Sequence, residues 1–563
     1  MSRKLIALVL SLMLLLTCIS ALATKELPDD ATITLETSEL DFTGKTFILH
    51  SNDVHGALDG YAYIAAYAKE VKEKGAEVIV VDAGDFSQGS PYVSLSKGHT
   101  AIEMMNLAGY DLATLGNHEF DFGYDQLMEN LKDAQFQVIS ADVYKDGELI
   151  LPAATIIERG GVKIGFFGME TPETATKVNP GLITGITFAT FDQLRESAQS
   201  AVDSLKAEGA DIIIGLWHMG IDDESAFNGY RSIDLLPKLT DVDFVIDAHS
   251  HTIMSVGSAG EPIQSTGTKF ANVGVIVIDN ATKTIEDNFL LPTLYMDKDG
   301  DVDAAAQEII SAVDEEYGAS FAVSDVQLNG ERDPGNRTME TNLGDLITDA
   351  MVWTVVKEGG IEQVEPNAVV GITNGGGIRA PIAPGDVTMK DVNTVLPFGN
   401  TVAVVYVTGE ELLEALEAST FCTPAAIGGY PQTCGIEWTL DATVEYDQGE
   451  LYHNADGSET SYYAPASIKR VTINAINGEA FDPAATYAVV TNNFCAAGGD
   501  TYNVFMRAYN EGAGFDTGIP MDEAVVNYIS EVLEGKVTEE DYGQPRGSET
   551  QILPEPAEEA PAA

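Results

Sequence analysis

The segment TFILHSNDVH, residues 46–55, combines the two features that decide the fold. It begins as a short apolar run of β-favouring residues and ends in Asp53 and His55. Such a run predicts a buried strand, and the polar residues behind it predict a site at the strand's carboxyl end. Five further runs are short, apolar and rich in β-favouring residues: 77–82 (EVIVVD), 111–115 (DLATL), 163–168 (KIGFFG), 211–217 (DIIIGLW) and 243–247 (DFVID).

Amphipathic stretches lie between several of these strands, among them residues 61–74 and 191–208. Strands that alternate with helices indicate an α/β fold. In such folds the loops at the carboxyl ends of strands converge and build sites. Because the polar clusters of this chain follow strand ends, we expect them to meet.

Histidine is scarce in this chain, yet five of the eight histidines fall in short segments after strands, beside two aspartates and an asparagine. Carboxylate and amide oxygens together with imidazoles suit Zn, Mn or Fe ions. One histidine on an apolar face is usually a core residue, but a cluster of this size predicts a centre with two divalent metal ions. The candidate ligands are Asp53, His55, Asp85, Asn117, His218, His249 and His251.

The spacing of these ligands suggests how they share two ions. Asp53 and His55 stand two apart and point the same way on an extended segment, so both can reach one ion. His249 and His251 have the same spacing, but each can serve a different ion. Asp85 is alone in its motif and is our candidate for a bridge between the ions.

The charge of the chain limits its partners. It has 88 acidic and 30 basic residues among 563, a formal charge of −58. Nucleic-acid binding needs a basic footprint, and so does binding to an anionic membrane, so this composition disfavours both. Bound cations can still dominate the field inside one cleft and hold an anionic substrate there.

The N-terminus predicts export from the cytoplasm. Residues 1–23 have a basic start, an apolar run over 5–16 and a small-residue site at Ala21–Ala23, the pattern of a signal peptide cleaved after Ala23. An uncleaved anchor is one alternative, and lipoprotein processing at Cys18 is another, which Thr17 fits poorly. No later run reaches the roughly 20 apolar residues of a transmembrane helix.

Three cysteines remain after residue 23. Disulfides persist outside the cytoplasm. Cys422 and Cys434 flank a short loop-like stretch, so we expect a bond between them. Cys495 is then a spare thiol, buried rather than reactive.

The strand–helix pattern changes near Lys298. Residues 297–301 read as a turn, which is not an EF-hand because Val302 stands where that motif needs glycine. A helix follows to about Tyr317. The expected organisation is a first domain over 44–297, a linker helix within 298–323, a smaller α/β domain over 324–540 and a disordered tail over 545–563, rich in Pro, Glu and Ala.

Five motifs give the chain a family resemblance: DVH (53–55), GDFSQG (84–89), GNHEFDFG (116–123), LWHMG (216–220) and AHSH (248–251). They resemble those of the calcineurin-like metallophosphoesterases, and specifically the secreted 5′-nucleotidase family that includes UDP-sugar hydrolases. The resemblance implies a four-layer β-sandwich flanked by helices. It also implies that one ion is held by Asp53, His55, Asp85 and His251, and the other by Asp85, Asn117, His218 and His249. Many bacterial relatives have Gln at the position of His251, so the metal preference can differ.

The resemblance assigns His118 as the catalytic histidine, outside the metal shell, with Asp121 orienting it. An imidazolium held by a carboxylate can stabilise the charge of the transition state and of the leaving oxygen. Taken alone, Asp121 has the alternative role of a turn or helix cap. We interpret Glu119 as structural.

The second domain resembles the 5′-nucleotidase C-terminal domain through ETNLGD (340–345), NGGGIR (374–379) and NFCAAGGD (493–500). The resemblance implies that arginines contact phosphate, that two aromatic rings sandwich the base and that an aspartate holds the ribose hydroxyls. The residues concerned are Arg337, Asn374, Arg379, Tyr430, Phe494 and Asp500. Relatives often carry a second arginine at the position of Met339, so one phosphate contact is weaker here or comes from another residue.

These observations predict a hydrolase that removes the 5′-phosphate from nucleoside monophosphates by in-line attack of a metal-held hydroxide. Hydrolysis of 2′,3′-cyclic nucleotides, or of the pyrophosphate in UDP-sugars or NAD, is the nearest alternative. The form GNHEFD, with Asp121 after the Phe, favours the 5′-nucleotidase branch. A surface binding protein without catalysis is the alternative of a different class, against which the complete ligand set with His118 and Asp121 argues.

Overall fold

The computed structural model describes residues 41–178, 182–222, 225–226, 229–358, 361, 363–454, 457, 459–510 and 512–554. Apart from Asp41 these residues belong to one unit, which begins at Phe42. The expected signal peptide, residues 1–23, lies outside the described residues. Among the helices of the described residues, none has the length and apolar character needed to cross a membrane.

The first half of this unit is built on two six-stranded sheets. The first, in order across the sheet, contains β15 (Thr284–Pro292), β14 (Asn272–Asp279), β1 (Lys45–Ser51), β2 (Glu77–Asp82), β3 (Leu112–Thr114) and β4 (Gln137–Ile139). The second contains β12 (Ile253–Met254), β13 (Ile263–Thr266), β11 (Phe244–Ile246), β10 (Ile212–His218), β8 (Val162–Glu170) and β7 (Ala154–Arg159). The expected strands are therefore present, with ends that differ by a residue or two.

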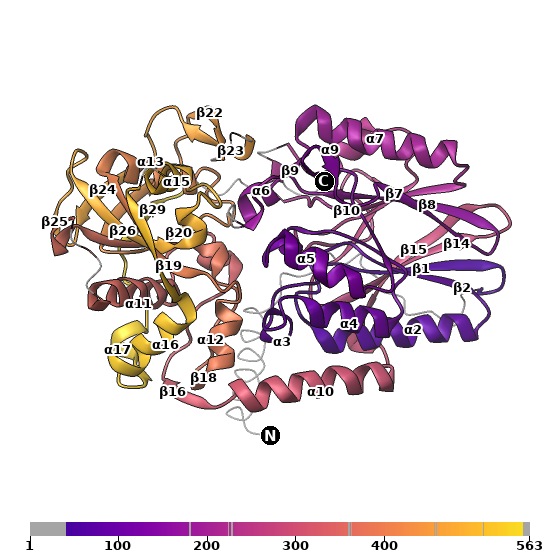
Figure 1. Ribbon diagram of the computed structural model, residues 1–563, viewed down its shortest axis with the longest axis horizontal. Coiled ribbons are helices and arrows are strands. Elements are labelled where there is room, and N and C mark those ends of the chain that lie inside the picture. Colours follow the sequence, from indigo (N-terminus) through magenta and orange to yellow (C-terminus); the bar gives the residue numbers. More distant parts are fainter. Residues whose placement is uncertain are drawn as a thin grey trace, which may run out of the picture. The chain divides into compact units, whose positions relative to one another are not determined.

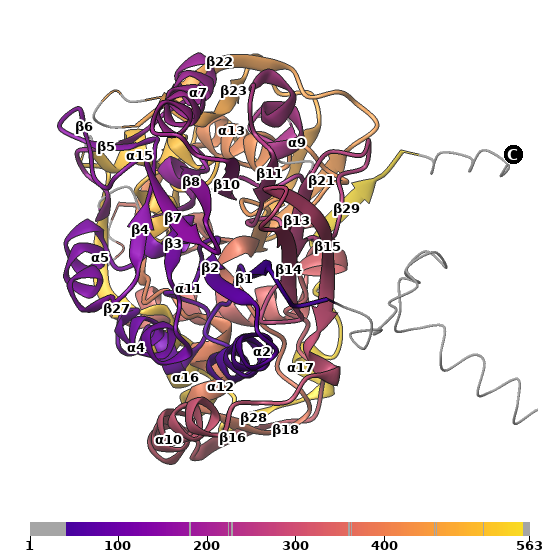
Figure 2. The same ribbon diagram turned by 90° about the vertical axis from the view of Figure 1, so that its right-hand side faces the viewer.

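The two sheets face each other across a core of aliphatic residues. Ile48 and Ile79 of the first sheet pack with Ile214 and Ile246 of the second, all fully buried. Helices α2 (Tyr61–Glu73) and α4 (His99–Ala108) cover the outer side of the first sheet, and α7 (Phe191–Ala207) covers the second. Figure 2 shows these four layers in order, from α7 through the two sheets to α2 and α4. The predicted α/β fold of four layers is confirmed.

Parallel pairing brings the polar clusters together. Strand β1 pairs in parallel with β2, with Ser51 opposite Asp82, and β2 pairs in parallel with β3. In the other sheet β10 pairs in parallel with β11, with Leu216 opposite Ile246. The carboxyl ends of these five strands therefore lie at one edge of the sandwich, where the predicted metal ligands follow them.

The helix expected near residue 302 is α10 (Gly300–Tyr317), which begins at an Asp299 cap and packs on α2. After it the chain forms a five-stranded sheet covered on both faces (Figure 1). Its strands, in order, are β20 (Pro431–Cys434), β17 (Val369–Asn374), β26 (Thr486–Asn492), β19 (Thr401–Thr408) and β27 (Gly514–Pro520). Helix α11 (Asn342–Glu358) packs on one face and α13 (Gly409–Ser419) on the other.

Two sequence-based predictions about this half are wrong. No disulfide joins Cys422 and Cys434, because Cys422 packs in the core beside α13 whereas Cys434 lies on β20 next to Asp349 and Arg546. The tail expected to be disordered from Pro545 contains β29 (Glu549–Ile552), which pairs in parallel with β21 (Ile436–Asp441). Residues 555–563 lie outside the described residues. Cys495 is buried, as expected.

Candidate active site

The backbone of the predicted metal ligands is strained in a consistent way. Asp53, His55, Asp85, His249 and His251 all have left-handed φ angles, between 44° and 73°. This conformation is uncommon outside glycine and costs free energy at each position. It occurs here in the turns that follow β1, β2 and β11, and it is typical of backbone held in place to direct functional side chains.

The first group of ligands converges on one point. The Nε2 atoms of His55 and His251 lie 3.0 Å apart, and Asp53 Oδ1 lies 3.9 Å and 3.6 Å from them. Burial lowers the pKa of both histidines well below its usual value, which favours the neutral imidazole. Two neutral imidazoles beside a carboxylate present lone pairs to the same place, as ligands of a divalent cation do.

The second group is organised by His218. Its Nδ1–H donates to the carbonyl oxygen of Ala83 at 2.8 Å, and Nε2 has no hydrogen-bond partner among the described residues. Nε2 points at Asp85, 3.1 Å from Oδ2. Burial lowers the pKa of His218, but Asp85, Asp53 and Glu170 outweigh burial and raise that pKa well above its usual value. A metal cation can take the place of the proton that this negative field attracts.

The fourth imidazole, His249, has a partner that the sequence did not reveal. Its Nδ1 lies 3.0 Å from Asn117 Oδ1, and its Nε2 lies 3.2 Å from Oε2 of Glu173, which is 1% exposed. A buried carboxylate on the far nitrogen fixes the orientation and tautomer of a metal-binding histidine. The feature of the sequence that could have indicated this partner is the pair of glutamates at 170 and 173, which follows the apolar run 163–168.

His118 stands beside these groups but bonds differently. Its Nδ1 lies 2.6 Å from Asp121 Oδ2, and its ring stacks on Phe398 at 5.6 Å between centroids. Burial opposes protonation, but Asp121 and Asp85 outweigh it and raise the pKa of His118. Glu119 instead accepts backbone N–H bonds from the turn after β2, for example from Asp85 at 2.8 Å, which is the structural role expected for it.

These groups fit a divalent metal. Three sets of side chains place ligand atoms within 4.8 Å of one another: Asp53 with His55 and His251, Asp53 with Asp85 and His218, and Asp85 with His55 and His118. Neutral imidazoles and buried carboxylates are what such a centre requires. Five of the seven predicted ligands appear in these sets, and Asn117 and His249 adjoin them.

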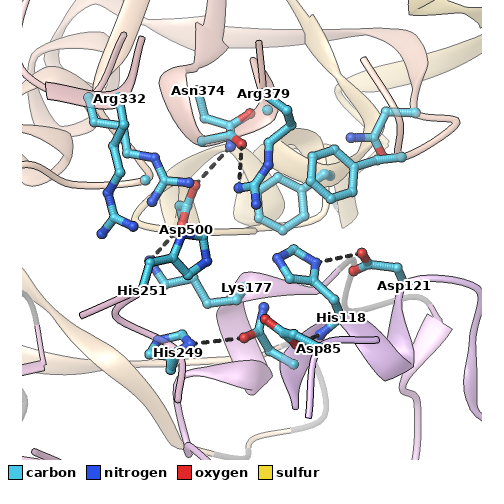
Figure 3. A pocket seen from close by; sticks show the side chains of 18 of the residues that line it. Asp85, His118, Asp121, Lys177, His249, His251, Arg332, Asn374, Arg379 and Asp500 are labelled. Carbon is cyan, nitrogen blue, oxygen red and sulfur yellow. Dashed lines mark hydrogen bonds and ion pairs between the residues drawn. The ribbon is translucent and has the colours of Figure 1, made fainter. Parts of the chain in front are cut away.

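A second wall of the pocket comes from the C-terminal half. Figure 3 shows Arg332, Asn374, Arg379 and Asp500 on one side and the histidines with Asp85 and Asp121 on the other. Arg337 and Phe494 also line the pocket. The two walls therefore place guanidinium groups opposite the candidate metal ligands, with His118 between them. An anion held by both walls would have its reacting group at the candidate metal centre.

Two ion pairs connect the walls. Lys177 Nζ lies 3.4 Å from Asp500 Oδ1, and Asn374 donates to the other Asp500 oxygen at 2.9 Å. Arg332 Nη2 lies 3.4 Å from Asp222 Oδ2. The pocket with these pairs formed has a volume of about 90 Å³, against about 300–1,000 Å³ for small-molecule sites. In this structure the pocket is therefore smaller than the sites that usually hold a small molecule.

Several pocket residues were not predicted, among them Lys177, Asp222, Arg332, Phe398 and Asn400. Arg332 stands five residues before Arg337 and supplies a guanidinium that Met339 lacks; Met339 is 42% exposed and lies outside the pocket lining. The others carry no sequence signal of their own, since their side chains meet only through the tertiary fold.

Tyr430, predicted to stack on a base, lies outside the pocket lining in this structure. It is fully buried in the C-terminal core, and its hydroxyl bonds with Glu549 and Gln551 of β29. Among the described residues, the aromatic side chains that line the pocket are Phe494 and Phe398, so the part of Tyr430 in a base sandwich stays a prediction. Strand β29 supplies the partners that hold the tyrosine inside the core in this structure.

Comparisons with known proteins agree with this geometry. Residues 48–252 match the family model of the calcineurin-like phosphoesterases, and residues 320–507 match that of the 5′-nucleotidase C-terminal domain. The trifunctional nucleotide phosphoesterase YfkN of Bacillus subtilis is 30% identical over 87% of this chain, which spans 35% of that longer protein. A snake venom 5′-nucleotidase of Crotalus adamanteus is 28% identical over 81% of this chain and 82% of its own. The crystal structure of a 5′-nucleotidase precursor from Thermus thermophilus is 28% identical, with a TM-score of 0.72, covering 91% of this chain and 100% of the other.

Proposed function

Because the chain belongs to the family that joins a calcineurin-like phosphoesterase domain to a 5′-nucleotidase C-terminal domain, and is a phosphoric ester hydrolase, we propose that it removes the 5′-phosphate from nucleoside monophosphates at a centre of two divalent metal ions. The observation that carries the proposal is the pocket in which candidate ligands face arginines and an aromatic ring. This arrangement suits a molecule with a phosphate at one end and a flat base at the other.

We assign the ligands as follows. Asp53, His55 and His251 would hold one ion, Asn117, His218 and His249 would hold the other, and Asp85 would be shared, with Zn, Mn or Fe as the metal. When bound, such ions polarise the phosphoryl oxygens and supply a nucleophile at neutral pH. They also provide the positive charge that a chain of formal charge −58 otherwise lacks.

The protein's own residues have distinct roles in this proposal. Asp121 holds the Nδ1 proton of His118, so the opposite ring nitrogen faces the pocket and can donate to the oxygen that leaves. Arg332, Arg337 and Arg379 orient the phosphate through their N–H groups. Phe494 stacks on the base, and Asn374 and Asp500 bind the ribose or the base edge.

We also propose that the protein works outside the cytoplasm, with domains over 44–297 and 324–540 joined through 298–323. The signal-peptide pattern of residues 1–23 supports this location. The venom origin of one relative agrees with it.

Three substrates test the proposed reaction: AMP, UDP-glucose and 2′,3′-cyclic AMP, each with and without a chelator. We expect AMP to be hydrolysed fastest and the chelator to abolish the activity. A preference for either of the other two would reassign the substrate, and inactivity on all three would overturn the proposed function. His118→Ala should lower kcat about 10²–10⁴-fold and leave the metal content unchanged.

A further inference from the structure

Asn492 is a fully buried asparagine behind the wall that the C-terminal half contributes to the pocket. Strand β26 ends at this residue, and its side chain caps the short helix α14 (Asn493–Ala496), which carries Phe494. Asn492 is not among the described residues that line the pocket. Any effect that it has on a ligand must therefore pass through its neighbours.

The side chain of Asn492 belongs to a chain of hydrogen bonds. Its Nδ2 donates to Asn374 Oδ1 at 3.0 Å and to Thr373 Oγ1 at 2.9 Å, and its Oδ1 accepts the backbone N–H of Cys495 at 2.8 Å. Asn374 in turn donates from Nδ2 to Asp500 Oδ2 at 2.9 Å, a contact that Figure 3 marks with a dashed line. The chain therefore runs from the start of α14 through two asparagines to a carboxylate on the pocket wall.

The two ends of this chain fix its direction. The backbone N–H of Cys495 can only donate, so it requires the oxygen of the Asn492 amide. An ionised carboxylate can only accept, so Asp500 requires the nitrogen of the Asn374 amide. Between these ends, every contact joins a donor to an acceptor only if Asn492 Nδ2 faces Asn374 Oδ1. Because hydrogen bonding decides which way an amide group points, the network determines the orientation of Asn374.

Burial makes this orientation costly to reverse. Asn492 is 0% exposed, Asn374 is 4% and Asp500 is 3% exposed. A reversed Asn374 would place its oxygen against Asp500 and its NH₂ group against that of Asn492, so two interior hydrogen bonds would be lost. The Cys495 thiol lies 3.5 Å from Asn374 Oδ1 and is a weak donor on the same side.

We propose that Asn492 is a positioning residue for nucleoside binding, because it keeps the NH₂ group of Asn374 turned toward Asp500. Both Asn374 and Asp500 line the pocket. In this orientation Asn374 holds the Asp500 carboxylate in place and offers N–H groups, not its oxygen, to a bound ligand. The nucleoside as the ligand rests on the proposed function, whereas the orientation of Asn374 does not.

Asn492→Ser separates the two roles of this side chain in the full, metal-reconstituted protein. Serine is a good helix cap and can still accept the Cys495 N–H, but it is too short to reach Asn374. We expect an unchanged melting temperature, an unchanged kcat and a KM for AMP raised about fivefold. Asn503→Ser is the matched control, because that buried asparagine donates to the His453 carbonyl at 2.7 Å, outside this chain of hydrogen bonds. Its KM should equal that of the wild type.

Asn492→Asp reverses the hydrogen bonding and keeps the size of the side chain. The new oxygen faces Asn374 Oδ1, so the Asn374 amide must turn over or move, and either change breaks its bond to Asp500. A crystal structure at about pH 8, where aspartate is ordinarily ionised, should show the Asn374 amide and the Asp500 carboxylate more than about 3.5 Å apart.

The structural readout needs no turnover, so a wild type inactive on AMP would refute the proposed reaction and leave the orientation of Asn374 open to test. The inference about Asn492 is overturned if the contact between Asn374 and Asp500 stays at 2.9 Å in Asn492→Asp. It is also overturned if Asn492→Ser keeps the wild-type KM, or if Asn503→Ser raises KM equally.

Discussion

Glu173 offers the sharpest test of how the candidate metal centre is built. Its buried carboxylate lies 3.2 Å from His249 Nε2, and the opposite nitrogen of that ring faces Asn117. A hydrogen bond to a charged group contributes about 1.5–3 kcal/mol, which corresponds to roughly 10–100-fold in metal affinity. Glu173→Ala should weaken metal binding by that factor. Glu173→Gln keeps a hydrogen-bond acceptor but loses the charge, so its metal affinity should lie between those of the wild type and Glu173→Ala.

The assay is competition with a chelator of known affinity, which reports the dissociation constant of the more weakly held ion. Asp121→Asn is the matched control, because Asp121 bonds to His118, which is outside our assigned ligand set. It should lower kcat and leave the metal affinity unchanged. The reasoning about Glu173 is refuted if Glu173→Ala holds both ions as tightly as the wild type, or if Asp121→Asn loses metal equally.

Three further predictions follow from buried groups. Burial lowers the pKa of His50 to about 4, so below about pH 6.5 the unfolded state binds a proton that the folded state does not, and the free energy of unfolding falls as the pH drops from about 6.5 to 4. Between pH 7 and pH 4, denaturant titrations should show the wild type losing about 3 kcal/mol more than His50→Gln. Equal losses in the two proteins would contradict this. Phe494→Ala should raise KM for AMP about tenfold. Tyr430→Phe should leave KM unchanged and lower the free energy of unfolding by about 1–3 kcal/mol. A raised KM for Tyr430→Phe would instead support its predicted role in stacking on the base. Reductant should not shift the melting temperature, since no disulfide joins Cys422 and Cys434, and a drop of several degrees would show a disulfide.

The first half of the fold was readable from the sequence because its signals are local. Each buried strand is a short apolar run, and its polar residues follow directly, as in β1 with Asp53 and His55. Parallel pairing then places the carboxyl ends of β1, β2 and β3 at one edge, and likewise those of β10 and β11, so the candidate ligand cluster needs no knowledge of distant contacts. Glu173 escaped prediction because its partner, His249, is 76 residues away.

The second half was less readable because its determinants are long-range. The composition of residues 545–563 suggested disorder, yet β29 gains backbone hydrogen bonds from β21 and buried contacts through Glu549 with Tyr430. That one strand overturned the prediction of a disordered tail and supplies the hydrogen-bond partners of Tyr430. The pocket residues Lys177 and Asp222 belong to the first half and meet Asp500 and Arg332 only in the folded chain.

Anomalous X-ray diffraction at the manganese edge, on crystals of the manganese-reconstituted protein, tests the central claim directly. We predict two peaks about 3.5–4 Å apart, one beside His55 and His251 and the other beside His218 and His249, with Asp85 between them. A single peak, or none at these side chains, would contradict the proposal that a pair of divalent ions performs the hydrolysis.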